Sequence, residues 1–122
     1  MSKVEQSSEM EGARGPDWLI VRVRVEPHEA AGFADRIWAL MEKHFIYRLV
    51  LEMDEVEFMP SVLMGQLVML QKRLLQHEGA LRLSGLRPTC EEALHFCRLD
   101  HTLSHFDSCV EAVQGSDSVR PR

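Results

Sequence analysis

Apolar and polar positions along the chain switch between the spacing of a strand and the spacing of a helix. From Trp18 to Val25 the residues are first apolar and then alternate, with three valines on one face and Arg22 and Arg24 on the other, which predicts a strand. From Glu29 to His44 apolar residues recur every three or four positions, as on one face of a helix. The same criteria predict strands over 48–53, 81–86 and 104–107, and helices over 61–77, 89–98 and 108–113.

Strand and helix alternate four times in this order, which predicts an α/β fold. We expect a mostly parallel central sheet of about four strands, with right-handed crossovers and the helices packed on it. The stretch 48–53 is mostly apolar, as expected for a strand that is covered on both faces. The polar ends without periodicity predict a disordered N-terminal arm over 1–16 and a disordered tail over 115–122, which leaves one domain over 17–114.

Residues that favour helix ends stand at the expected boundaries. Ser61 is a candidate N-cap, and Thr89 with Glu92 three residues later matches a capping box. Ser108 is placed to cap a last helical turn. Gly79 is expected to end the helix over 61–77 in the left-handed conformation.

Charge and composition exclude several classes of function. The net charge of −5 over 122 residues, with scattered arginines, argues against a nucleic-acid partner. No apolar run reaches the length of a membrane span, and the first residues lack the apolar segment of a secretory signal. Three cysteines without a close-spaced pair are typical of reduced thiols, so we expect a cytoplasmic protein.

Enzymatic and metal-binding chemistry find little support in the sequence. Cys90, His95, Cys97 and His101 lie close together, but no CxxC or HExxH spacing is present. No GxSxG surrounds a serine, and the glycines form no phosphate-binding loop. We therefore expect no catalytic residue, no metal and no cofactor, although Cys90 or His95 would be the first candidates in an enzyme.

The stretch from Leu49 to Gly79 is the most informative for function. An apolar strand is followed by an acidic turn and then by a helix whose first residues carry a hydroxyl, on Ser61. That hydroxyl suits either a structural cap or a phosphorylation switch, because a helix N-terminus tolerates added negative charge. The carboxylates of Asp54, Glu55 and Glu57 belong either to a solvated turn or to an acidic rim that faces a partner.

Three segments together resemble the STAS family, which comprises anti-sigma factor antagonists of bacteria and the cytoplasmic tails of sulfate transporters. They are Phe58 to Gly65 (FMPSVLMG), Glu78 to Cys90 (EGALRLSGLRPTC), and the ending from Leu99-Asp100 to Val113. The resemblance implies the STAS fold from about Trp18 to Val113 and places the family's phosphoacceptor on Ser61. It also implies a partner-binding surface at Asp54, Glu55, Glu57, Met59, Ser61, Val62, Met64 and Gly65.

Two functions follow from this resemblance. The first is a non-catalytic module that resembles an anti-sigma factor antagonist, binds a serine kinase-type anti-sigma factor and is regulated at Ser61. The second is an accessory STAS subunit that docks on the ATPase of an ABC transporter without phosphorylation. The second is favoured by Pro60, which stands where phosphorylated members usually have an Asp.

Overall fold

The structure is a computed structural model that describes residues 3–7 and 18–114, with the backbone alone for 3–7. The strands are β1 (Lys3–Ser7), β2 (Leu19–Arg24), β3 (Arg48–Glu52), β4 (Ala80–Ser84) and β5 (Ser104–Phe106). The α-helices are α1 (Phe33–His44), α2 (Ser61–Gln76), α3 (Pro88–Phe96) and α4 (Cys109–Gln114), and a short 3-10 helix, η2 (Pro27–Glu29), follows β2. Each strand and helix predicted from residue spacing is therefore present, with ends that differ by a few residues.

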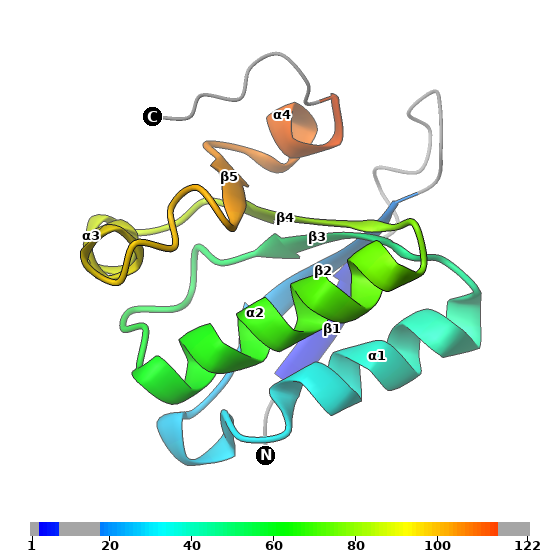
Figure 1. The fold of residues 1–122 in the computed structure, drawn as a ribbon, viewed down its shortest axis with the longest axis horizontal. Helices are drawn as coiled ribbons and strands as arrows, with labels where there is room; N and C mark the ends of the chain where they lie inside the picture. The colour runs from blue at the N-terminus through cyan, green and yellow to red at the C-terminus, as the bar shows by residue number, and fades with distance from the viewer. Residues whose placement is uncertain (1–2, 8–17, 115–122) are drawn as a thin grey trace.

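The five strands form one sheet in the order β1-β2-β3-β4-β5 (Figure 1). Strands β2 to β5 run parallel, and β1 pairs with β2 in the antiparallel sense. The predicted α/β fold with a mostly parallel sheet is confirmed. Because parallel strands place their carboxyl ends at one edge of the sheet, the loops after β2, β3 and β4 all leave the sheet on the same side.

Strand β1 corrects the prediction of a disordered arm over 1–16, which is wrong for Lys3–Ser7. Lys3 pairs with Arg24 and Ser7 pairs with Ile20, so the segment completes the open edge of β2. An edge strand is held by backbone hydrogen bonds and needs no apolar side chains, and for that reason the polar sequence KVEQS carries no strand pattern. Residues 8–16 and the tail 115–122 lie outside the described residues.

The two faces of the sheet are covered differently (Figure 1). Helices α1 and α2 lie on one face and enclose most of the buried apolar side chains. Helix α4 lies on the other face over a smaller cluster of Ile20, Val50, Phe106 and Ala112. On α2 the predicted stripe is fully buried, and each such leucine contributes about 1.5–3 kcal/mol before conformational entropy is subtracted; its members are Leu63, Leu67, Leu70 and Leu74.

The end of α2 differs from the expected glycine stop. The left-handed residue is Glu78, with φ of 60°, and Gly79 follows it. The Glu78 N–H donates to Leu75 O at 3.1 Å and the Gly79 N–H donates to Leu74 O at 2.7 Å, which is the Schellman arrangement. Gly79 is needed for space, because a Cβ there would lie 1.9 Å from the carbonyl oxygen of Tyr47.

Candidate functional site

The acidic turn after β3 leads directly to α2. The Met53 N–H donates to Ser84 O at 2.8 Å, which ties the start of the turn to β4. Met53, Val56 and Met59 are buried, whereas Asp54, Glu55, Glu57 and Phe58 are exposed. The apolar side chains therefore anchor the segment to the hydrophobic core, and its carboxylates face solvent.

Helix α2 begins differently from the prediction that Ser61 caps it. Pro60 holds the N-cap position with extended backbone (φ −67°, ψ 156°), and its carbonyl oxygen accepts the first helical hydrogen bond from the Met64 N–H at 3.1 Å. Ser61 is thus the first residue inside the helix, where its hydroxyl does not point back at the free N–H groups. The Ser61 side chain is exposed, and among the described residues its hydroxyl has no hydrogen-bond partner.

Helix α3 also begins differently from the predicted capping box of Thr89 and Glu92. Arg87 is the N-cap and Pro88 occupies the first helical position. The Thr89 hydroxyl donates instead to the backbone oxygen of Glu57 at 2.8 Å. The predicted cap at Ser108 is confirmed, since its Oγ accepts the Glu111 N–H at 3.2 Å.

The predicted partner-binding residues do not all reach the surface. Met59 and Met64 are each only 7% exposed and belong to the core, so their assignment to the binding surface is wrong. Both side chains pack in the larger hydrophobic core cluster. The other predicted members, Asp54, Glu55, Glu57, Ser61, Val62 and Gly65, are exposed and remain candidates.

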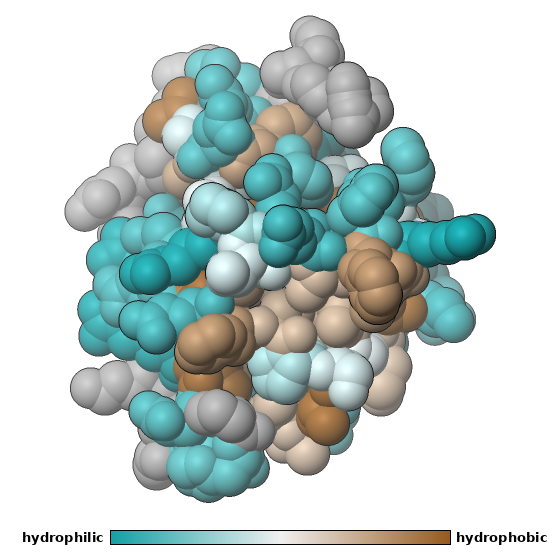
Figure 2. Space-filling model, turned by 90° about the vertical axis from the view of Figure 1, so that its left-hand side faces the viewer, coloured by the Kyte–Doolittle hydropathy of each residue, from teal (hydrophilic) through white to brown (hydrophobic). Residues whose placement is uncertain are grey.

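Phe58, which the sequence pattern did not indicate as a member of the binding surface, is 71% exposed at the end of the turn. Val62 and Met69 are each 51% exposed on α2, and they lie one turn before and one turn after Gly65 on the same side of the helix. Figure 2 shows the end of the molecule where α2 begins and α3 lies, with apolar side chains gathered in the lower half and bordered by hydrophilic ones. Phe58 lies between the exposed Glu57 and the buried Met59, so no alternation of apolar and polar positions marks its ring as exposed.

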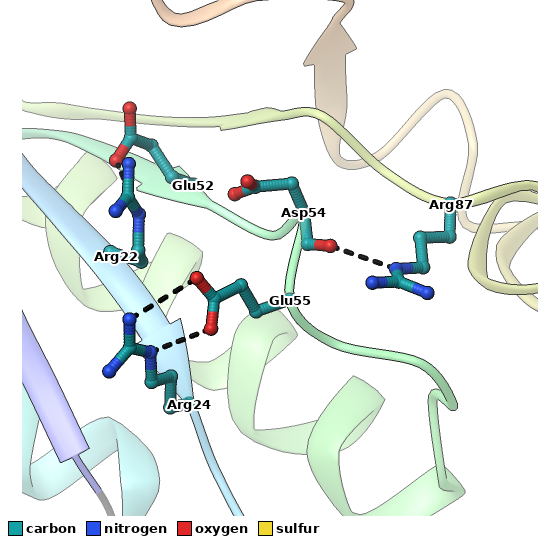
Figure 3. A network of polar contacts seen from close by, with 6 residues as sticks. All are labelled: Arg22, Arg24, Glu52, Asp54, Glu55 and Arg87. Atoms are coloured by element: carbon teal, nitrogen blue, oxygen red, sulfur yellow. Dashed lines mark hydrogen bonds and ion pairs between the residues drawn. The ribbon is translucent and has the colours of Figure 1, made fainter.

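Arginines surround the acidic turn (Figure 3). Arg24 donates to both carboxylate oxygens of Glu55, from Nε at 2.7 Å and from Nη2 at 3.2 Å. This paired hydrogen bond holds the pKa of Glu55 below its ordinary value of 4.5. Arg87 Nε donates to the backbone oxygen of Asp54 at 2.8 Å. Within the described residues the side-chain carboxylates of Asp54 and Glu57 form no ion pair, so the turn keeps uncompensated negative charge.

The residues considered for enzymatic chemistry are poorly placed for it. Cys90 is fully buried, its Sγ donates to Val56 O at 3.3 Å, and burial raises its pKa. A thiol of this kind is a weak nucleophile, because the thiolate is the reactive form. The exposed His95 pairs with Asp100 at 2.8 Å. Residues 3–7 and 18–114 contain no group of three or more His, Cys, Asp or Glu side chains arranged to hold a metal ion.

Comparison with known proteins agrees with this fold. The model of the STAS domain family matches residues 11–112, so the chain belongs to the STAS domain family. A crystal structure of TM1081 from Thermotoga maritima, described as a candidate anti-sigma factor antagonist, superposes with a TM-score of 0.69 at 19% identity and covers 78% of this chain and 85% of that chain.

An NMR structure of TM1081 gives a TM-score of 0.72 at 21% identity and covers 87% of each chain. At this identity the likeness concerns the fold. A comparison with curated proteins gives no significant match. Among the described helices, none is both long and apolar enough to cross a membrane.

Proposed function

We propose that this protein is a non-catalytic interaction module that acts in the manner of an anti-sigma factor antagonist in the bacterial cytoplasm. Its partner in this proposal is a serine kinase-type anti-sigma factor, and its binding surface is the amino end of α2 with the acidic turn beside it. The supporting observation is the exposed hydroxyl of Ser61 on the first turn of α2, which has no hydrogen-bond partner in residues 3–7 and 18–114 and lies next to the exposed Val62 and Gly65. STAS proteins of this type are generally non-catalytic, which agrees with the buried Cys90.

The surroundings of Ser61 suit a switch that changes binding and leaves the fold intact. A phosphate would add a charge of about −1.5 to −2, and the positive end of the α2 dipole would stabilise it locally. The hydroxyl supports no cap, so modification breaks no hydrogen bond among the described residues. Gly65 lies one turn after Ser61, and a Cβ at that position would meet no atom within 4 Å, so a partner's backbone can approach this side of the helix.

The test compares wild type with Ser61→Asp and Ser61→Ala in binding to a candidate serine kinase-type anti-sigma factor. We expect Ser61→Asp to weaken binding by at least about tenfold, equivalent to 1.4 kcal/mol, through charge in the interface. Ser61→Ala should bind like wild type. Ser104→Asp, which places the same charge at an exposed position on β5, is the matched control. Equal affinity for Ser61→Asp and Ser104→Asp would refute the switch.

A second candidate function is an accessory subunit that docks on the ATPase of an ABC transporter without phosphorylation. It is favoured by Pro60, which holds the N-cap position directly before Ser61 and brings no carboxylate to the hydroxyl. Co-purification with an ATPase subunit would support it over the first function. Intact-mass measurement after incubation with the candidate kinase and ATP separates the two, because only the first predicts an added phosphate on Ser61.

A further inference from the structure

We propose that a pocket beside Ser61 receives one aliphatic side chain of the partner, and that a Lys or Arg next to it in the partner's chain contacts Glu57 and Phe58. This inference rests on the proposed function, since it names the chemistry that the same surface recognises. The pocket is a binding element separate from the exposed side of α2 that carries Ser61, Val62 and Gly65.

The pocket lies between the segment that follows β2 and the turn that leads to α2. Its volume is about 190 Å³. Pro60 and Leu63, which stand on either side of Ser61 in the chain, form part of its wall. The remaining lining combines apolar and acidic residues, namely Val25, Ala30, Val56 and Phe58 with Glu55 and Glu57.

The volume decides between two kinds of occupant. Sites for small organic ligands and cofactors usually measure about 300–1,000 Å³. A pocket of 190 Å³ is smaller than that range and suits a single side chain. Apolar anchors that fill such pockets at the centre of an interface commonly carry much of the binding energy. We therefore assign the pocket to a side chain that a partner inserts.

The residues at the rim of the pocket indicate which partner residue lies next to the inserted aliphatic side chain. Glu55 is engaged by Arg24, so its charge is compensated. Glu57 also lines the pocket, is exposed, and forms no ion pair within the described residues. Phe58, 71% exposed, presents a ring on which a cation can stack. A free carboxylate beside an exposed aromatic ring selects a Lys or Arg.

The test follows backbone amide shifts of the full chain by NMR during titration with three capped peptides. They are acetyl-GKLKG-amide, acetyl-GELEG-amide and acetyl-GKSKG-amide. We expect the first to shift the amides of Val25, Ala30 and Leu63 with a Kd on the order of 1 mM, as for a contact of a few groups. The other two should bind at least about tenfold more weakly, because one reverses the charge and the other removes the anchor.

Variants provide a second readout with acetyl-GKLKG-amide. Glu57→Lys should weaken binding by roughly tenfold through charge reversal, and Val25→Trp should abolish it by filling the pocket. Glu42→Lys, an exposed change on α1, is the charge control and should bind like wild type. Circular dichroism melts establish that each variant folds, and Glu57→Lys carries the test if Val25→Trp does not.

Each other outcome overturns the inference in a recognisable way. Equal shifts from the lysine and glutamate peptides contradict the assigned charge, and equal shifts from toluene contradict a protein anchor. Shifts of the lining amides on raising protein concentration alone would assign the pocket to a second copy. If the partner kinase binds wild type and Val25→Trp equally but loses Ser61→Asp, the pocket inference fails while the proposed function stands.

Discussion

Helices α2 and α3 begin with similar residues, but the hydroxyl groups at the two helix starts make different contacts. Each opens with a proline followed by a hydroxyl residue, Pro60-Ser61 and Pro88-Thr89. Pro60 is the N-cap of α2, whereas Pro88 is already the first residue of α3, so the two hydroxyls differ by one position within their helices. The Thr89 hydroxyl donates to Glu57 O at 2.8 Å, and the Ser61 hydroxyl is free among the described residues.

The side chains at the start of α3 have a structural role, whereas the first turn of α2 belongs to the proposed binding surface. Two side chains of α3 hold the acidic turn, Thr89 through Glu57 O and Cys90 through Val56 O at 3.3 Å. The start of α2 is held from inside the core, by Leu63 and Met59. Its other side, with Ser61, Val62 and Gly65, is exposed and forms part of the proposed binding surface.

The largest expected effect is a loss of stability on replacing Leu63, and it tests whether the first turn of α2 is held by its contacts with the core. Leu63 is 2% exposed, so Leu63→Ala should lower the free energy of unfolding by about 2–5 kcal/mol through a cavity on the core side of the first turn. Val62→Ala, one residue earlier on the exposed side, should change it by less than about 0.5 kcal/mol. Urea unfolding at neutral pH measures both. Similar losses at the two positions would contradict the division of this turn into a buried and an exposed side.

The next effect compares the two hydroxyls directly. Thr89→Val keeps the shape of the side chain but leaves Glu57 O without its donor, and should cost about 1 kcal/mol of unfolding free energy. Ser61→Ala removes no hydrogen bond among the described residues and should stay within about 0.5 kcal/mol of wild type.

Thr89→Ser is the control for this pair, because it restores the hydroxyl and should recover most of the loss. Urea midpoints for all three variants, measured in parallel, provide the comparison. A loss at Ser61→Ala as large as that at Thr89→Val would show that Ser61 has a structural role.

The smallest effect concerns the charge beside these helix starts. Arg24 holds the pKa of Glu55 below 4.5, so the ionised form is favoured in the folded state. Wild type should therefore be slightly more stable than Glu55→Gln at neutral pH, and this advantage should disappear as the pH falls through the lowered pKa. High salt should reduce it, because the pair is exposed.

Urea midpoints from about pH 3 to about pH 7 measure this difference. Glu57→Gln, which removes an exposed carboxylate that forms no ion pair within the described residues, is the matched control for the loss of one negative charge. The opposite trend, with wild type gaining on Glu55→Gln in acid, would contradict the assigned contact.

The sequence predicts the parallel part of this fold because its elements are encoded by local spacing. The leucines at 63, 67, 70 and 74 mark the buried side of α2, and Val21 and Val23 mark one face of β2. Strand β1 escapes this reasoning, since its pairing with β2 depends on backbone groups that exist in every sequence.

The candidate site is predicted only in part because its details depend on contacts between distant segments. Thr89 lies 32 residues from the backbone oxygen that accepts its hydroxyl, and that partner is invisible in a local pattern. Met59 and Met64 look like surface residues beside Ser61 in the sequence but lie under the turn and the helix. The acidic residues are found correctly on the surface, whereas the pairing of Glu55 with Arg24 requires the positions of β2 and the turn together.

At the opposite end of α2, position 79 accepts no side chain larger than that of glycine. Since a single methyl group at Gly79 would overlap the carbonyl oxygen of Tyr47, the crossover from α2 into β4 and the segment that enters β3 touch without any intervening side chain. Any larger residue at 79 would force these two segments apart at the entrance to the sheet. This contact fixes the carboxyl end of α2 against the entrance to β3, so the proposed binding surface at the other end of the same helix keeps a constant direction relative to the sheet.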